Sequence, residues 1–453
     1  MTNELDAFFE PESIAVIGAS RSEEKLGYSI LENLKVTFPG KIYPINPNAV
    51  EISGLTAFPS VLEVEEPIDL AVIVIPADLV KSAVEDCIKK KIKAAVIISS
   101  GFSEIGNKEA EEELKKISKG KIKLIGPNCV GIYKKDLDML FFPRKRLKRP
   151  IEGSIAFVTQ SGAFGTALLD MIANEGVGIS KFISIGNKVD VDEIELLNYL
   201  ENDLETRCIA MYLESTEKGL ELIKTAKKIV KKKPIVIYKA GKTEKGSEAV
   251  ASHTGKLTKE PEVYSAAFKQ AGIIEANSTE EIFDYAKSLA NQPILDSTNI
   301  GIITDGGGFG VIAADEITKA GLEIPEYSKD TLRALRSVLP SYGIAKNPVD
   351  LTGDANAERY EKALNAVFKD RVIDGVVVIA LLQVPTLEEH ITDIIRDCKV
   401  HGKPFTVCTI GGKWVKERVR TLERFGVPVY PTPERAARAL VVLKEYADIL
   451  KRK

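Results

Sequence analysis

Apolar and polar positions alternate along most of the chain in two distinct ways. Short runs rich in Val, Ile and Ala that end in Gly, Asn or Ser predict buried strands, whereas the longer segments between them place apolar residues three and four positions apart, as amphipathic helices do. This alternation is typical of parallel α/β sheets. The pattern starts over twice, and 453 residues exceed what one hydrophobic core usually organises, so we expect three α/β domains in succession.

The first domain, residues 1–130, is predicted to be a Rossmann-like sheet with its ligand edge at the carboxyl ends of the strands. Residues 131–150 follow it and contain most of the basic run PRKRLKRPIEG. Because runs of like charge usually lie in solvent, we expect a solvated linker there. The predicted strands of the first domain are Ser13–Ile17, Ile42–Asn46, Leu70–Ile75, Ala94–Ser99 and Lys123–Ile125.

The two later domains, residues 151–292 and 293–453, are predicted to be flavodoxin-like parallel sheets. Their openings, SIAFVTQSGAFGTALLDMI and NIGIITDGGGFGVIAADEI, share a strand, a Gly-bearing turn, Phe-Gly and a helix, as if one plan had been used twice. The expected strands are Ser154–Thr159, Lys181–Ile185, Cys208–Leu213 and Ile235–Lys239 in one domain, and Ile300–Thr304, Gly375–Leu381 and Phe405–Thr409 in the other.

Both openings place the start of a helix directly after a strand. The first N–H groups of a helix lack intrahelical partners and the helix dipole is positive there, so each turn is a candidate phosphate site. A plain glycine turn, common to any α/β fold, is the alternative for either turn alone. The candidate residues are Gln160, Ser161 and Gly162 in the first turn and Gly306, Gly307 and Gly308 in the second.

The turn after the first strand, GASRSEEKLG, is a candidate site for a phosphorylated ligand. It lacks a complete G-x-G-x-x-G, and Ile45 leads into Asn-Pro-Asn where a NAD-binding sheet would carry an acid, which counts against a dehydrogenase. Coenzyme A, with a nucleotide head and a long arm, suits a wide sheet edge of this kind. Plain turn roles remain the alternative. The candidate CoA-binding residues are Gly18, Ala19, Ser20, Arg21, Lys25, Asn46, Pro47, Asn48, Ile75, Pro76, Ser100 and Asn128.

Histidine is scarce, so the position of each one is informative. His390 and His401 occur in solvated or helix-end contexts and are assigned no function. His253 lies in the polar, small-residue segment GSEAVASHTG, which we expect to form a mobile loop. A neutral imidazole is a nucleophile near pH 7 and can accept a phosphoryl group if its other ring nitrogen is held. Glu214, at the end of an apolar strand, is the candidate carboxylate that holds it.

Charge and composition exclude several other classes of protein. A net charge of -3 disfavours nucleic-acid binding. We expect a cytoplasmic protein, because no stretch approaches the roughly 20 apolar residues of a membrane span and the first residues, MTNELDAFFEPE, are acidic, unlike a signal peptide. Five scattered cysteines indicate reduced thiols, with neither disulfides nor a metal site.

Several motifs, in this order, carry a resemblance to a known family: GASRSEEKLG, INPN, IPAD, GPNCVGI, TQSGAFG, SIGNKVDVDEIELLNYL, YLES and SHTGKL. Over nearly its whole length the chain resembles the NDP-forming acyl-CoA synthetase family, which includes succinyl-CoA synthetase, and in particular its archaeal ADP-forming α subunits. The resemblance implies that His253 is phosphorylated, that Glu214 orients it, that the two helix starts stabilise phosphate and that the first domain binds CoA.

The same resemblance implies a reaction and a partner. Acyl-CoA, ADP and phosphate would be converted to acid, ATP and CoA through an acyl phosphate and phospho-His253. We find no Lys-bearing P-loop and no ATP-grasp segment in the sequence, so ATP, ADP and Mg²⁺ would be bound by a separate ATP-grasp β subunit in an α2β2 heterotetramer. A non-catalytic CoA-binding regulatory or scaffold protein is the alternative. Which carboxylic acid is used is left open.

Overall fold

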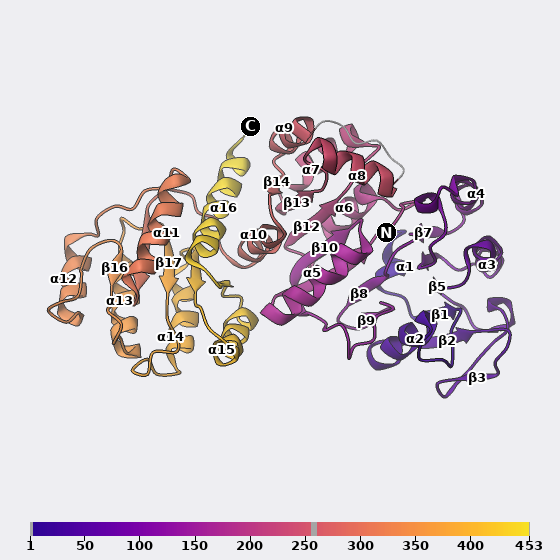
Figure 1. Ribbon diagram of the computed structural model, residues 1–453, viewed down its shortest axis with the longest axis horizontal. Coiled ribbons are helices and arrows are strands. Elements are labelled where there is room, and N and C mark those ends of the chain that lie inside the picture. The colour runs from indigo at the N-terminus through magenta and orange to yellow at the C-terminus, as the bar shows by residue number, and fades with distance from the viewer. Residues whose placement is uncertain (1–2, 255–260, 453) are drawn as a thin grey trace. The chain divides into compact units, whose positions relative to one another are not determined.

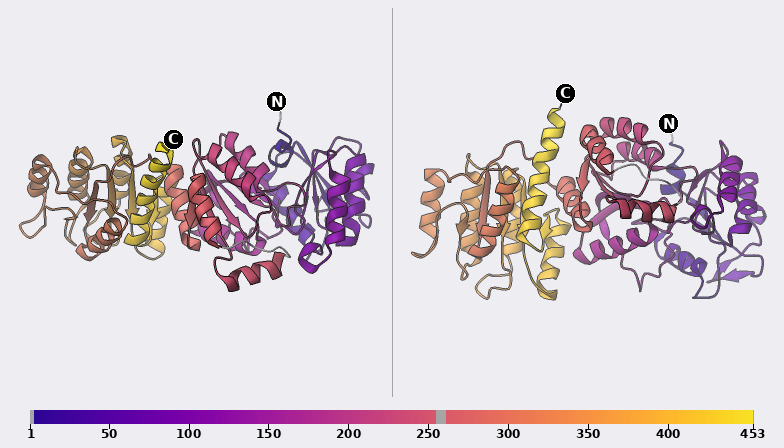
Figure 2. Two further views of the ribbon diagram at one scale, coloured as in Figure 1. Left: turned by 90° about the horizontal axis from the view of Figure 1, so that it is seen from above. Right: turned by 45° about the horizontal axis from the view of Figure 1, so that its top comes forward.

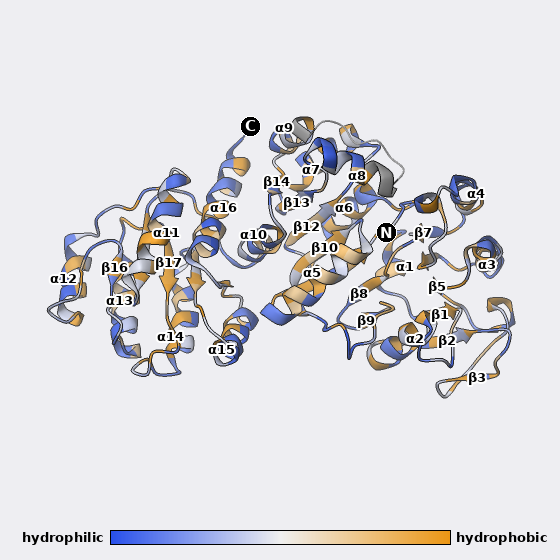
Figure 3. Cartoon of the chain, in the orientation of Figure 1, coloured by the Kyte–Doolittle hydropathy of each residue, from blue (hydrophilic) through white to orange (hydrophobic). Residues whose placement is uncertain are grey.

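The computed structural model describes residues 3–254 and 261–452. The chain forms two compact units, of which unit 1 comprises Met1–Asn174 and Ile179–Asn277, and unit 2 comprises Glu175–Gly178 and Ser278–Lys453 (Figure 1). Every large sheet carries helices on both faces, and the strands are the most hydrophobic segments (Figures 2 and 3). The predicted α/β class is confirmed, with several parallel-sheet domains.

The first sheet of unit 1 is fully parallel, with strand order β2-β1-β5-β6-β7 among the described residues. All five residues of β1 are buried, as expected for a strand covered on both faces. Helices α2 (Leu26–Thr37), α3 (Ala77–Lys89) and α4 (Lys108–Ser118) connect the strands. The strands are β1 (Ser13–Ile17), β2 (Lys41–Ile45), β5 (Leu70–Ile73), β6 (Ala94–Ile97) and β7 (Lys123–Ile125). The short helix α1 (Asp6–Phe9) precedes β1, and a small hairpin, β3 (Glu51–Ile52) and β4 (Leu55–Thr56), follows β2.

The second sheet of unit 1 has the order β14-β13-β12-β10-β11-β8-β9 among the described residues. Strands β10, β12, β13 and β14 pair in parallel, and β8 joins β11 in antiparallel fashion. The strands are β8 (Ile132–Lys134), β9 (Leu137–Asp138), β10 (Ile151–Thr159), β11 (Gly178–Ser184), β12 (Cys208–Leu213), β13 (Ile235–Lys239) and β14 (Ile274–Ala276). The helices are α5 (Gly162–Glu175), α6 (Glu193–Asn202), α7 (Gly219–Ile229), α8 (Glu244–Thr254) and α9 (Pro261–Ala271).

Residues 131–150 differ from the solvated linker that the charge run predicts. Strands β8 and β9 belong to the second sheet, and the chain then folds around the buried carboxylate of Asp138. The Arg149 Nε lies 2.9 Å from Asp138 Oδ2, and Arg144 Nη1 lies 2.6 Å from the same oxygen. A buried carboxylate needs such partners, so part of the basic run is structural.

Unit 2 contains a parallel sheet with the order β16-β15-β17-β18-β19 among the described residues. Helix α10 (Thr279–Asn291), which we expected to close the second domain, belongs to this unit. Its Asp284 forms a bidentate ion pair with Arg435 of α16 at 2.6 and 2.7 Å. The strands are β15 (Ile300–Thr304), β16 (Val349–Asp350), β17 (Gly375–Ile379), β18 (Phe405–Cys408) and β19 (Val429–Tyr430), and the other helices are α11 (Gly307–Lys319), α12 (Lys329–Val338), α13 (Ala357–Lys369), α14 (Ile391–Asp397), α15 (Lys413–Arg424) and α16 (Pro433–Lys451).

The segment around His253 is helical in its described part, whereas we expected a loop. The hydroxyl of Thr243 accepts a hydrogen bond from Gly246 N at 3.0 Å, as an N-cap residue does. The following Glu, Lys and Ala residues have high helix propensity, which outweighs the small polar residues among them. The loop prediction was therefore wrong for residues 246–254, and Gly255 lies outside the described residues.

None of the helices in the described ranges is both long and apolar enough to cross a membrane. The five cysteines are buried free thiols.

Candidate functional site

A cavity of about 980 Å³ lies at the carboxyl edge of the first sheet of unit 1 and reaches the start of α5. Arg21 and Pro47, two of the predicted residues, lie outside its lining and are exposed. The predicted residues that line it are Gly18, Ala19, Ser20, Lys25, Asn46, Asn48, Ile75, Pro76, Ser100, Asn128, Gln160, Ser161 and Gly162. The cavity thus brings together two groups of residues, one proposed for CoA and one for phosphate, that are far apart in sequence.

The turn between β1 and α2 forms one end of the cavity. Gly18 has φ +95°, in the left-handed region that favours glycine, and a Cβ on Gly27 would lie 2.0 Å from Gly18 O. Helix α2 therefore starts directly against the end of β1. Asn46 donates from Nδ2 to Ala19 O at 2.8 Å, which ties the turn to the end of β2. The N-cap position of α2 is Lys25, a cation beside the free N–H groups of the helix start.

The neighbouring strand ends form the middle of the cavity. Ser99 Oγ donates to Ile75 O at 2.6 Å and accepts from Ile75 N at 3.1 Å, which joins the ends of β5 and β6. Asn128 N donates to Ser99 O at 2.8 Å and continues this edge to β7. Sequence reasoning named Ser100 and missed Ser99, which also lines the cavity. Both serines end the same apolar run, so the pattern alone could not separate them.

The start of α5 forms the other end of the cavity. Thr159 Oγ1 donates to Ser161 O at 2.8 Å, and Ser161 Oγ accepts from Phe164 N at 3.3 Å. The first N–H groups of α5 have no intrahelical acceptors, and Gly162 and Ala163 line the cavity. This end is suited to a small anion such as phosphate.

Glu214 and Ser215 follow β12, and three side chains form hydrogen bonds with their backbone N–H and C=O groups. Gln160 Oε1 accepts from Glu214 N at 2.9 Å and from Ser215 N at 3.0 Å. Lys239 Nζ donates to Glu214 O at 2.7 Å, and Lys188 Nζ donates to Ser215 O at 2.8 Å. We call Gln160, Lys188 and Lys239 the Glu214 clamp. It fixes the backbone from which the Glu214 carboxylate projects.

The side chains of the clamp are buried, and burial shifts the pKa of Lys239 and of the neighbouring Tyr212. Lys239 is 3% exposed, and burial lowers its pKa to about 8. Burial, reinforced by the nearby Glu214 carboxylate, raises the pKa of Tyr212. The Lys188 ammonium is paired with Glu193 at 2.9 Å. Sequence reasoning did not identify Lys188 or Lys239; the signal for Lys239 was a lysine that ends an otherwise apolar strand, which is expensive unless the charge is held.

His253 belongs to α8, and its side chain lies outside the described residues. Its predicted pairing with Glu214 therefore stays a prediction. Helix α8 follows β13, the strand that ends at Lys239, and β13 pairs with β12, the strand that Glu214 directly follows.

The second predicted phosphate turn lies in unit 2, at the start of α11. Gly306 is the N-cap residue of this helix. The preceding Asp305 is 3% exposed and accepts hydrogen bonds from Leu381 N through both oxygens, at 3.2 and 3.0 Å. Burial, with a contribution from Asp350, raises the pKa of Asp305 to about 6. This helix start therefore lies beside acidic groups.

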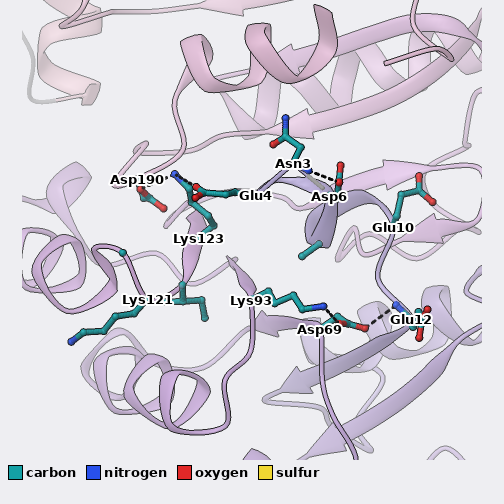
Figure 4. A pocket seen from close by; sticks show the side chains of 13 residues that line it. Asn3, Glu4, Asp6, Glu10, Glu12, Asp69, Lys93, Lys121, Lys123 and Asp190 are labelled. Atoms are coloured by element: carbon teal, nitrogen blue, oxygen red, sulfur yellow. Dashed lines mark hydrogen bonds and ion pairs between the residues drawn. The ribbon is translucent and has the colours of Figure 1, made fainter. Parts of the chain in front are cut away.

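A second cavity, of about 920 Å³, lies at the opposite, amino-terminal edge of the first sheet (Figure 4). Its charges are largely paired with one another: Lys93 lies 2.8 Å from Asp69, and Lys123 lies 3.8 Å from both Glu4 and Asp190. Ligands of open α/β sheets bind at the carboxyl edge, so the first cavity is the candidate site. No group of three potential metal-ligating His, Cys, Asp or Glu side chains occurs in the described parts of the chain.

Comparisons with known proteins agree with this geometry. Residues 12–135 match a CoA binding domain, residues 152–289 a succinyl-CoA ligase like flavodoxin domain, and residues 300–447 a ligase-CoA domain. Together these domains cover most of the chain.

The chain is 40% identical to acetate–CoA ligase [ADP-forming] II subunit alpha of Pyrococcus furiosus, over 98% of both chains. It is 41% identical to acetate–CoA ligase [ADP-forming] I of Archaeoglobus fulgidus, where it spans 98% of its own length and 64% of that relative's. A solved structure of dinucleotide forming acetyl-coenzyme A synthetase 1 from Ca. Korarchaeum cryptofilum, in complex with phosphate and ADP, matches 98% of this chain and 97% of its own with a TM-score of 0.91 and 37% identity.

Proposed function

The chain belongs to the family of ADP-forming acid–CoA ligases, and we propose that it is the CoA-binding, phosphate-carrying α subunit of such an enzyme. The overall reaction is acyl-CoA + ADP + phosphate ⇌ acid + ATP + CoA. The non-catalytic CoA-binding role considered from the sequence is not supported by the family assignment.

The observation that carries this proposal is the cavity at the carboxyl edge of the first sheet. It connects the β1–α2 turn, which suits the nucleotide part of CoA, with the α5 start, which suits phosphate. A thioester bound along the cavity has its carbonyl carbon beside the phosphate. Proximity of this kind replaces a collision between two molecules by a reaction within one complex.

Three steps then account for the reaction. Phosphate attacks the thioester carbonyl, and the CoA thiol leaves as the acyl phosphate forms. A ring nitrogen of His253 attacks the phosphorus, and the carboxylic acid leaves. The phosphoryl group then passes from His253 to ADP, which forms ATP and restores the imidazole. Glu214 accepts a hydrogen bond from the other ring nitrogen and favours the positive charge that the ring acquires.

The subunit name of the Pyrococcus relatives implies a partner subunit. We infer that this partner is an ATP-grasp β subunit that binds ADP, ATP and Mg²⁺, and that the complex is an α2β2 heterotetramer. The reaction then takes place in the cytoplasm, where acyl-CoA, ADP and phosphate occur together.

Labelling of the full chain tests the phosphohistidine directly. Acetyl-CoA with ³²P-phosphate should label the wild-type chain without its partner, and the label should be acid-labile, base-stable and confined to the peptide with Ser252-His253-Thr254. His253→Ala should abolish both labelling and turnover while leaving CoA binding unchanged. His390→Ala is the matched control and should label normally. Label on a serine or threonine, turnover by His253→Ala, or labelling by γ-³²P-ATP without the partner would refute the proposal.

Glu214→Gln tests the orienting carboxylate. The amide keeps the size of the side chain but removes its negative charge, so we expect the rate of His253 phosphorylation to fall by about 10²-fold. The exposed Glu221 of α7 supplies the control Glu221→Gln, which should leave this rate unchanged. A rate for Glu214→Gln within twofold of wild type would remove Glu214 from the mechanism. CoA affinity, measured by calorimetry, should be the same for both variants.

A further inference from the structure

Val130 and Phe141 line the candidate cavity, and neither has been assigned a role. Val130 is 6% exposed and lies against the start of α5: a Cβ on Gly162 would be 2.7 Å from Val130 Cγ1. Phe141 comes from the segment after β9. Met139 N donates to Ile132 O at 3.1 Å, so this segment runs antiparallel to β8 and brings Phe141 back past Val130. Both side chains therefore bound the phosphate end of the cavity.

The backbone on both sides of Phe141 is fixed by buried side chains. Asn33 of α2, 3% exposed, donates from Nδ2 to Leu140 O at 2.6 Å and to Phe142 O at 3.0 Å. Arg149 donates to Phe142 O at 2.8 Å. Its guanidinium is in turn held by the buried Asp138, at 2.9 and 3.2 Å.

The Phe141 ring also has little freedom to move. It stacks on the ring of Phe142, with centroids 4.4 Å apart and an interplanar angle of 28°. A ring on a fixed backbone and against a second ring does not yield easily to a larger ligand, because close-packed side chains transmit strain rather than absorb it. The segment that looked like a basic linker thus forms a rigid part of the cavity.

The chemistry of this end follows from the proposed function, on which the inference rests. In an acyl phosphate, one oxygen joins phosphorus to the acyl carbon, so a phosphoryl group at the α5 start places the acyl chain among the nearest side chains. Val130 and Phe141 offer that chain an apolar surface. Lys25 is the one cation among the described residues that line the cavity, and it belongs to the β1–α2 turn at the other end.

We propose that Val130 and Phe141 form the wall of the acyl pocket and restrict the enzyme to small, uncharged acyl chains. A branched or aryl chain meets the Phe141 ring. A second carboxylate, as in a dicarboxylic acid, finds no positive charge at this wall and would be desolvated without a partner.

The test compares thioesters of graded size in the complex of this chain with its partner subunit. The kcat/KM for ATP formation is measured with acetyl-CoA, isobutyryl-CoA, phenylacetyl-CoA and succinyl-CoA. Phe141→Ala should raise the isobutyryl-to-acetyl and phenylacetyl-to-acetyl ratios by about tenfold or more, the range expected when a pocket gains room for one or more methylene groups. Phe141→Leu and Val130→Ala should shift them in the same direction by less. Succinyl-CoA should stay poor in every variant.

Phe142→Leu is the matched control, because this ring supports Phe141 but does not line the cavity. Because the Phe141 ring is still present in this variant, its ratios should shift by much less than those of Phe141→Ala. Two results would contradict the proposal that Val130 and Phe141 form the wall of the acyl pocket. One is unchanged ratios in active Phe141→Ala, Phe141→Leu and Val130→Ala; the other is a shift in Phe142→Leu equal to that in Phe141→Ala.

Calorimetry of the same thioesters with the full chain gives a readout that does not need turnover. The wall predicts that Phe141→Ala strengthens binding of phenylacetyl-CoA relative to acetyl-CoA, whereas free CoA binds as in wild type. If the wild-type complex forms no ATP from any thioester, the proposed function fails, yet this shift in affinity would still support the wall. An unchanged affinity ratio would count against it even in an active enzyme.

Discussion

The starts of α5 in unit 1 and α11 in unit 2 follow the same sequence plan, TQSGAFG and TDGGGFG, and share the same local structure. In α5, Thr159 Oγ1 donates to Ser161 O at 2.8 Å; in α11, Thr304 Oγ1 donates to Gly306 O at 2.9 Å. Each threonine ends a central strand of its sheet, β10 or β15.

The two turns differ in the residue after the threonine, although that residue has the same structural task. Gln160 accepts hydrogen bonds from the N–H groups that follow β12, the neighbour of β10. Asp305 accepts from the N–H group that follows β17, the neighbour of β15. One side chain is neutral and the other is an acid whose pKa burial raises to about 6.

From this difference we expect the two helix starts to differ in their affinity for phosphate, although they share a backbone structure. Beside α11, the carboxylates of Asp305 and Asp350 oppose an anion; Asp350 Oδ2 would lie 2.7 Å from a Cβ on Gly307. Beside α5, Gln160 brings no charge, and the helix dipole acts without that opposition. We therefore expect the α5 start to be the stronger phosphate site.

The largest expected effect comes from placing a carboxylate at position 160 of the α5 start, as Asp305 does at the α11 start. Gln160→Glu keeps an oxygen that accepts from Glu214 N and Ser215 N but places a buried negative charge beside the phosphate. The KM for phosphate should rise by about 10- to 100-fold, because like charges at short range in a poorly screened site repel strongly.

Gln160→Met controls for loss of the clamp without a new charge. It should lower kcat through misplacement of Glu214 and leave the KM for phosphate near the wild-type value. Equal phosphate KM values in Gln160→Glu and Gln160→Met would show that charge does not distinguish the two helix starts.

A smaller effect, on the free energy of unfolding, is expected when alanine replaces the glycine that packs against the threonine at each helix start. A Cβ on Gly165 would lie 2.4 Å from Thr159 Cγ2, whereas a Cβ on Gly310 would lie 3.0 Å from Thr304 Cγ2. Gly165→Ala should therefore reduce the free energy of unfolding of unit 1 by about 1–3 kcal/mol, as overpacking does. Gly310→Ala should change that of unit 2 by less than about 1 kcal/mol, since the better helix propensity of alanine offsets the tighter contact.

Hydrogen exchange followed by mass spectrometry measures each unit separately in the full chain. Thr159→Ser removes the crowded methyl group and keeps the hydroxyl, so adding it to Gly165→Ala should recover most of the lost stability. Equal losses in the two alanine variants would mean that the two helix starts are packed alike.

The smallest effect concerns the pH dependence of unit 2. A carboxyl group with a higher pKa in the folded state than its ordinary value of 3.8 binds its proton more tightly when folded, so its contribution to stability is lost as pH rises from about 4 to about 6. Asp305→Asn should remove this loss, which corresponds to a shift of a few degrees in Tm.

The single tryptophan, Trp414, lies at the start of α15 and reports unfolding of unit 2 by fluorescence. The Tm values of wild type and Asp305→Asn should agree near pH 4, separate as pH rises from about 4 to about 6, and differ by a constant amount above that. Asp330→Asn, at an exposed position of α12, is the control and should follow wild type. Parallel curves for wild type and Asp305→Asn would contradict the assignment of this titration to Asp305.

Hydrophobic periodicity and turn residues by themselves determine most of the architecture. A strand buried on both faces must be apolar throughout, so the predicted strands coincide closely with β1, β12 and β15, and the helix starts at Gly162 and Gly307 follow from the glycine turns. The order of motifs along the chain is enough to indicate the family.

Tertiary structure decided what local patterns could not. Lys188 looks like an ordinary charged residue in sequence, and the position of Lys239 at the end of an apolar strand does not say what holds its charge; only the sheet order places both on the two carbonyls that follow β12. The basic run after β9 looked solvated because its counter-charge, Asp138, is buried by contacts distant in the chain. Sequence patterns report the local preference of each segment, whereas the cavity and the clamp arise where segments distant in sequence meet.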